Sequence, residues 1–189
     1  MKMMTNDDIS KLKTAALYVL NKCGEMDFIH LFKILYFAER NHYAKYGKHL
    51  IKDNFCALER GPVPSFLYNA LKITVGKTSE SPSEELMELS KAFLPGEAEC
   101  YYFIRPNEKP DMNELSIADI RDLDESYNDN ISVSSLLLSK KSHDTAWKKA
   151  WEKQHNSLID SSDIALAGGA KKEFVKYIEE QESFDRFLA

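Results

Sequence analysis

The histidines are the residues of this chain whose chemistry could bind a metal. They are His30, His42, His49, His143 and His155. None of them pairs at the i, i+4 spacing that helical zinc sites use. The sequence therefore predicts no metal site.

The tripeptide Ser142-His143-Asp144 contains the residue types of a hydrolase triad. Triads are assembled in space from distant parts of a chain, so adjacency alone is no sign of one. We interpret Ser142 as a helix cap and Asp144 as an anion in the first helical turn that follows. The glycine-rich nucleotide motifs are also missing. We therefore expect no cofactor and no enzyme activity.

Glu39 stands out in the predicted helix over residues 26–46, because a rotation of about 100° per residue places it on the apolar face. The same rotation places His30, Lys33, Arg40 and Asn41 on the opposite side. A buried carboxylate needs partners. The first interpretation is a structural role, bonded to backbone amides or to a cation such as Arg60 or His42. The alternatives are a catalytic carboxylate near His42, or a mistaken helical phase.

Large aromatic side chains on or after the same helix are the candidates for contact with another protein. Phe37 lies opposite the centre of the apolar face, and Tyr43 and Tyr46 follow near the helix end. A few buried aromatics usually carry most of the energy of a protein interface. Burial in the core of this chain is an equal alternative for each of them.

The elements that must position these residues are mostly helical. Helical periodicity and capping residues predict helices at about 6–22, 26–46, from Pro64 onward, from Ser81 to Pro95-Gly96, from Ser116 onward, 132–154 with a break near Ser142, and 170–188. Strands are expected near 54–59 and 100–105. The fold class is therefore mainly α, a compact multi-helix domain with one small β element of one or two short strands. Alternating strand–helix units are missing, which excludes a doubly wound sheet.

Composition and charge narrow the class of protein further. The chain has 189 residues, a net charge of −5 and three widely spaced cysteines. This charge argues against a broad nucleic-acid surface, although two lysine pairs, Lys140-Lys141 and Lys148-Lys149, form a modest basic face. No apolar run approaches the ~18–20 residues that span a bilayer. The start of the chain lacks the apolar stretch of a signal peptide, so we expect a cytoplasmic protein with no membrane partner.

An ordered set of short motifs resembles the Panacea domain, the SocA-like antitoxin family that also includes phage-associated GepA-like proteins. The stretch Leu31–Arg40 resembles the helix of that family, with Glu39 in place of the usual Asp. The Gly47, Ala57, Gly61-Pro62 and Tyr68 positions follow in order, and the later Ser142-His143 and Trp147 match as well. The motif positions are Tyr36, Glu39, Arg40, Gly47, Ala57, Gly61, Pro62, Tyr68, Ser142, His143 and Trp147.

The resemblance implies an antitoxin of a type II toxin–antitoxin system that neutralises a cognate toxin by direct binding. Delivery of the toxin to a bacterial protease is an additional route. A phage-derived DNA-binding regulator and an enzyme of unassigned chemistry are the alternatives. We expect residues 1–160 to form the Panacea-like domain and residues 161–189 a helical extension packed on it.

Overall fold

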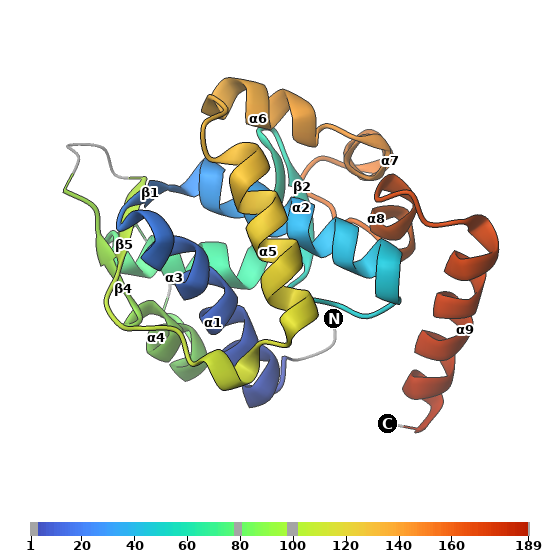
Figure 1. The fold of residues 1–189 in the computed structure, drawn as a ribbon, viewed down its shortest axis with the longest axis horizontal. Helices are drawn as coiled ribbons and strands as arrows, with labels where there is room; N and C mark the ends of the chain where they lie inside the picture. Colours follow the sequence, from blue (N-terminus) through green and yellow to red (C-terminus); the bar gives the residue numbers. More distant parts are fainter. Residues whose placement is uncertain (1–3, 78–80, 98–101, 189) are drawn as a thin grey trace.

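Helices form most of the chain in the computed structural model, which describes residues 4–77, 81–97 and 102–188. The prediction of a mainly α fold with little β-structure is confirmed. Figure 1 shows helix α2 (Phe28–Tyr46) crossing the middle of the molecule, with α5 (Ile117–Asn130) in front of it. The hydrophobic core surrounds α2, because the other elements pack on all of its sides.

Local capping sets the ends of the first two helices. Helix α1 (Asn6–Cys23) begins with a capping box in which Thr5 and Asp8 bond each other's backbone amides. Helix α2 ends at Gly47, whose φ of 64° suits a glycine. The predicted start at residue 26 is wrong by two residues. Met26–Asp27 forms a short strand, β1, and the carboxylate of Asp27 caps the helix instead.

A buried hairpin lies against α2. Strand β2 (Phe55–Leu58) confirms the strand expected near residues 54–59. The segment Gly61–Pro64, for which no strand was predicted, forms its partner strand β3. Strand β3 can contain proline because, in the described residues, β2 is the only strand that pairs with it. The missing N–H of proline therefore leaves no ladder bond unmade on its outer edge. Helix α3 (Ser65–Thr74) follows at once, with Pro64 at the cap position and not inside the helix.

A second, three-stranded antiparallel sheet has the order β1–β5–β4. Strand β5 (Phe103–Pro106) overlaps the strand expected at 100–105, of which residues 100 and 101 lie outside the described part of the chain. Helix α4 (Glu84–Ser90) begins after Ser83, two residues later than expected from Ser81. The predicted end at Pro95-Gly96 is wrong, because the segment Phe93–Pro95 forms β4 along the edge of β5.

The second half of the chain wraps around α2 with short helices. Helix α5 begins with a Ser116–Asp119 capping box. The predicted break near Ser142 is confirmed, since α6 (Ser135–Ser142) and α7 (Thr145–Lys153) are separate. A short 3-10 turn (Met112–Glu114) precedes α5. None of the helices in the described residues is both long and apolar enough to cross a bilayer.

The end of the chain adds two helices beside the C-terminal end of α2. Helix α8 (Ser161–Ala167), which periodicity did not predict, packs on α2 and α7. Helix α9 (Lys172–Leu188) follows at one edge of the molecule (Figure 1). Its Val175 and Ile178 join Tyr43 of α2 and Ala165 of α8 in a small second core. The boundary expected at residue 160 stays a prediction.

Candidate functional site

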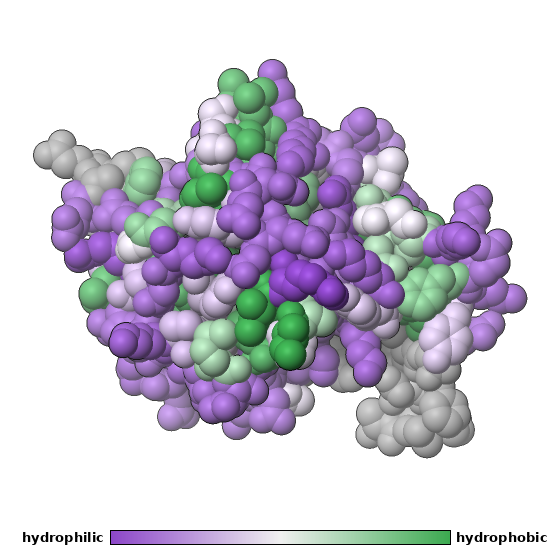
Figure 2. All heavy atoms as spheres, viewed as in Figure 1, coloured by the Kyte–Doolittle hydropathy of each residue, from purple (hydrophilic) through white to green (hydrophobic). Residues whose placement is uncertain are grey.

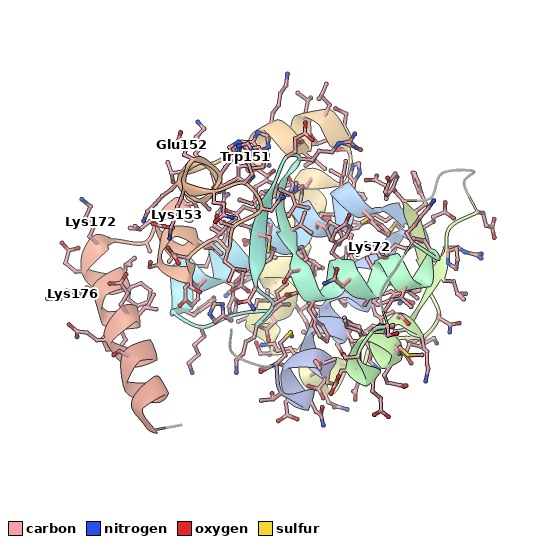
Figure 3. The ribbon with its side chains drawn as sticks, turned by 180° about the vertical axis from the view of Figure 1, so that it is seen from behind. Lys72, Trp151, Glu152, Lys153, Lys172 and Lys176 are labelled. Atoms are coloured by element: carbon pink, nitrogen blue, oxygen red, sulfur yellow. The ribbon has the colours of Figure 1, made fainter. Side chains whose placement is uncertain are left out.

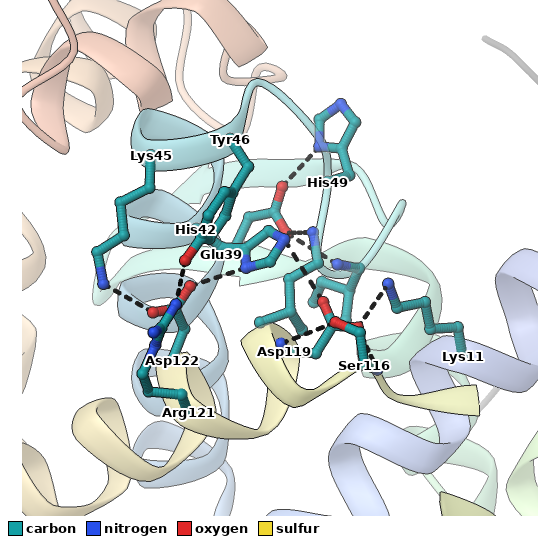
Figure 4. Close-up of polar contacts among 12 residues, drawn as sticks. Lys11, Glu39, His42, Lys45, Tyr46, His49, Ser116, Asp119, Arg121 and Asp122 are labelled. Atoms are coloured by element: carbon teal, nitrogen blue, oxygen red, sulfur yellow. Dashed lines mark hydrogen bonds and ion pairs between the residues drawn. The ribbon is translucent and has the colours of Figure 1, made fainter. Parts of the chain in front are cut away.

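The carboxylate of Glu39 is buried, with only 1% of the residue exposed. One oxygen accepts hydrogen bonds of 2.8 Å from the backbone amides of Leu50 and Ile51. The other lies 2.6 Å from Nδ1 of His49 (Figure 4). The predicted burial and amide bonding are confirmed. The predicted partners Arg60 and His42 are wrong, because Arg60 is exposed at the hairpin tip and His42 faces two aspartates of α5. Glu39 fixes the connection between α2 and β2.

His42 links α2 to α5 through two aspartates (Figure 4). Its Nδ1 lies 2.8 Å from Asp122, and its Nε2 lies 3.4 Å from Asp119. Lys45 and Lys11 approach the remaining oxygens of these carboxylates at 2.7 and 3.1 Å. Each ring nitrogen of His42 therefore faces one carboxylate of α5. Because these groups pair with one another, the cluster braces helices α1, α2 and α5.

Lys33 was expected on the solvent side of α2, and the structure corrects this. The residue is 1% exposed, because β3 and α6 cover that side of the helix. Its Nζ donates a hydrogen bond of 2.8 Å to the carbonyl oxygen of Pro62. Burial lowers the pKa of Lys33 to about 7.

Gly61 and Ser142 complete the surroundings of Lys33. Gly61 has a φ of +97°, and a Cβ placed there would overlap the hydroxyl of Ser142 and lie 3.0 Å from the Lys33 ammonium. Ser142 is the last residue of α6 and donates to the carbonyl oxygen of Ser139. It is therefore not a cap for the following helix, and it is too buried to meet a substrate.

Asp144 joins Tyr36 and Arg40 of α2 to helix α7. One oxygen caps α7 by accepting from the amides of Ala146 and Trp147. The other accepts from the hydroxyl of Tyr36 at 2.9 Å and from Arg40 at 3.1 Å. Asp144 is thus the cap of α7, not a residue of its first turn. Burial and the nearby carboxylate raise the pKa of Tyr36 well above its usual range.

Four aromatic rings stack along α7. The ring of His143 lies 3.7 Å from that of Trp147, which is followed by Trp151 at 5.2 Å and then His155 at 3.9 Å. The indole N–H of Trp147 donates to the carbonyl oxygen of Leu58 in the hairpin. Burial lowers the pKa of His143. Through Trp147, this stack anchors α7 to the hairpin.

The three aromatic residues expected to contact a partner have different surroundings. Phe37 is buried, with the Arg40 guanidinium and the Lys141 ammonium about 5 Å from its ring centre. Tyr43 is buried under the small core formed by α8 and α9. Only Tyr46 is substantially exposed, at 39%. A helical wheel of α2 does not show which of the three side chains is exposed, because elements from other parts of the chain cover most of the helix.

The described residues contain no cluster of three or more histidine, cysteine, aspartate or glutamate side chains that could hold a metal ion. The family model described as Antitoxin SocA-like, Panacea domain, matches residues 31–148. The match covers more than half of the chain. The chain belongs to the SocA-like Panacea family. No curated protein and no solved structure matches it.

The Panacea match runs from α2 into α7, so it contains the polar clusters described above except for Lys11 of α1. Its motif residues hold the domain together. Ala57 is bonded on both backbone sides by the segment around Ser157, and Tyr68 packs edge-on against Phe28 and Phe32. Sequence reasoning missed Asp122 and Asp144 as partners of these residues. The one local signal was that Asp144 stands three residues before Trp147, at a position that can cap a helix.

Proposed function

We propose that this Panacea protein is an antitoxin that neutralises a cognate toxin by binding it directly and that it catalyses no reaction. The observation that carries the proposal is the family match over residues 31–148. The buried polar groups support it, because Glu39, His42 and Lys33 bond to other parts of the same chain. A catalytic site needs such groups to face a substrate.

The basic residues favour a protein partner over DNA. Figure 3 shows Lys153 on α7 and Lys172 and Lys176 on α9 along one edge of the molecule, with Glu152 among them. Lys149 pairs with Asp163, and Lys176 approaches Glu180. Binding to nucleic acid requires cations that are free to replace counterions at phosphates. Alternating and paired charges are typical of an ordinary solvated surface.

Co-expression tests the proposal. The product of the adjacent gene is expressed in bacteria alone, then together with this chain, and growth and co-purification are measured. We expect toxicity alone, and rescue with a stable complex when the two are together. A non-toxic neighbour, or a toxic one that is neither rescued nor bound, contradicts the antitoxin function. Rescue without a complex contradicts direct binding and favours a transcriptional or enzymatic route.

The fate of the toxin separates occlusion from delivery to a protease. If the chain only blocks its partner, the amount of toxin stays constant after protein synthesis is stopped. If it acts as an adaptor, the toxin disappears faster in its presence than in its absence. Repeating the measurement in a strain without the main cytosolic proteases should then restore the toxin level while the complex persists.

A further inference from the structure

Two adjacent leucines are exposed on helix α6. Leu136 is 67% and Leu137 is 56% exposed. Figure 2 shows apolar side chains gathered over α6 at the top of the molecule. Single exposed apolar residues are common, but neighbouring ones at the tip of a domain form a patch that water solvates poorly.

The fold itself does not use these leucines. Leu138 and Ser142 are fully buried and form the side of α6 that packs on the core. Ser134 caps the start of the helix by accepting from the amide of Leu137. Polar residues at positions 136 and 137 would therefore leave the core unchanged. Packing among the described residues therefore does not account for the apolar character of this surface.

The patch is held rigidly, which favours binding because little conformational entropy is lost. Ser139 of α6 donates to the carbonyl oxygen of Arg60 at the hairpin tip, at 3.1 Å. Lys141 donates to the side-chain carbonyl of Asn130 at the end of α5, at 2.7 Å. Helix α6 is thus fixed to two neighbouring elements, while Leu136 and Leu137 face outward.

Positive charge borders the patch. Lys140 lies one helical turn after Leu136 and shares its face. Arg60 is exposed where the hairpin meets α6. Helix α6 contains no acidic residue, and the exposed Glu59 lies beside Arg60 in the hairpin turn. In a chain of net charge −5, this is a local apolar and cationic surface.

We propose that Leu136, Leu137, Lys140 and Arg60, together called the α6 surface, form the docking surface for the toxin. This rests on the proposed antitoxin function. The partner that fits is a protein with an apolar pocket for the two leucines and carboxylates on its rim. Buried apolar anchors supply most of the affinity of such an interface, and complementary rim charges raise the association rate.

Leu136→Glu/Leu137→Glu tests the α6 surface, with Ile117→Glu as the matched control. Ile117 is 87% exposed at the start of α5, whereas α6 is bonded to the opposite end of α5 at Asn130. We measure binding to the purified product of the adjacent gene, together with growth rescue. The double variant should bind about 30-fold more weakly or worse, because it removes central anchors. Its melting temperature should stay within about 2 °C of the unmodified chain, as for other exposed sites.

Lys140→Glu should act differently, by slowing association most strongly at low salt. If the unmodified chain binds and the double variant binds equally well, the α6 surface is wrong and the antitoxin function stands. If the unmodified chain does not bind at all, the proposed function itself fails. If the unmodified chain dimerises, the double variant is monomeric and toxin binding is unchanged, the surface serves self-association and the inference is overturned.

Discussion

Lys33 donates a hydrogen bond of 2.8 Å from its ammonium to the carbonyl oxygen of Pro62, 29 residues later in the chain. The bond joins the central helix to the inner strand of the hairpin. The side chain is buried, and its pKa is lowered to about 7 because the charged form loses its hydration. A buried ammonium with a neutral partner is costly when it carries its charge.

The stability of the protein should therefore rise with pH above neutrality. The pKa of Lys33 is about 7 when folded, against an ordinary value of 10.5. Between these values the unfolded chain binds more protons, so the free energy of unfolding increases with pH by up to about 1.4 kcal/mol per pH unit. Below pH 7 both states are protonated and this contribution to the slope vanishes. Urea unfolding at pH 7, 8 and 9 measures the slope.

Lys33→Met isolates the contribution of this residue, because methionine fills the space without a charge. Relative to the unmodified chain, the variant should be most favoured at pH 7, and this advantage should shrink steadily toward pH 9, because the unfolded lysine stays protonated up to its ordinary pKa of 10.5. The exposed Lys153, changed to Met, serves as the control and should leave the slope unchanged. A stability difference between Lys33→Met and the unmodified chain that stays constant from pH 7 to 9 would falsify the assignment.

Gly61→Ala should destabilise the fold by about 2–4 kcal/mol, from backbone strain together with overlap in a packed region. The φ of Gly61 is +97°, and the new methyl would overlap the hydroxyl of Ser142. The same substitution in a Ser142→Ala background should cost less, because the overlapping oxygen is gone. Unfolding free energies of the single and double variants measure this coupling.

Gly76→Ala is the matched control for the strain at Gly61. Its φ of +67° is also positive, but a Cβ there meets nothing within 4 Å. Only the backbone term remains, so the cost should be about 1 kcal/mol. Equal losses at the two glycines would show that the packing of Ser142 against Gly61 does not matter.

Glu39→Ala should lower the free energy of unfolding by about 1–3 kcal/mol, because it leaves two buried backbone amides without an acceptor. Glu39→Gln should cost less, since the amide oxygen can still accept from Leu50 and Ile51. Thermal and urea unfolding of both variants give the comparison. Equal losses for Ala and Gln would mean that the charge and its contact with His49, not the amide bonds, supply the stabilisation.

The parts of the fold that could be predicted from the sequence are those fixed by nearby residues. Thr5 with Asp8, and Ser116 with Asp119, close their capping boxes three residues apart, and Gly47 ends α2 through its own backbone. Periodicity alone also placed Glu39 in the core. These signals lie within one or two helical turns, so a single sequence contains all of them.

The remaining features depend on contacts between distant segments. Lys33 is buried only because the hairpin and α6 fold over the polar side of α2. Asp53 caps α3 from outside, accepting from Phe66 and Leu67, and burial raises its pKa to about 6. The same long-range packing buries Phe37, which a helical wheel places on the outer face. No local rule contains this information.

The two carboxylate oxygens of Asp144 bond to two different helices. One caps α7 through two backbone amides, and the other accepts from Tyr36 and Arg40 of α2. Removing the carboxylate should therefore loosen α7 and also leave a buried tyrosine hydroxyl without its acceptor. A serine hydroxyl at this position would still cap α7 but would not bond Tyr36 and Arg40.

Asp144→Ala should cost more stability than Asp144→Ser, by about 1 kcal/mol, because serine keeps the cap of α7. Both variants should lose the bonds to Tyr36 and Arg40, at about 1–3 kcal/mol for the orphaned buried donors. The control is Asp160→Ala, since Asp160 precedes α8 without a side-chain cap bond and should change little. Urea unfolding followed by tryptophan fluorescence measures all three variants, because Trp147 lies in the capped helix. Equal losses for Ala and Ser would assign the whole effect to Tyr36 and Arg40.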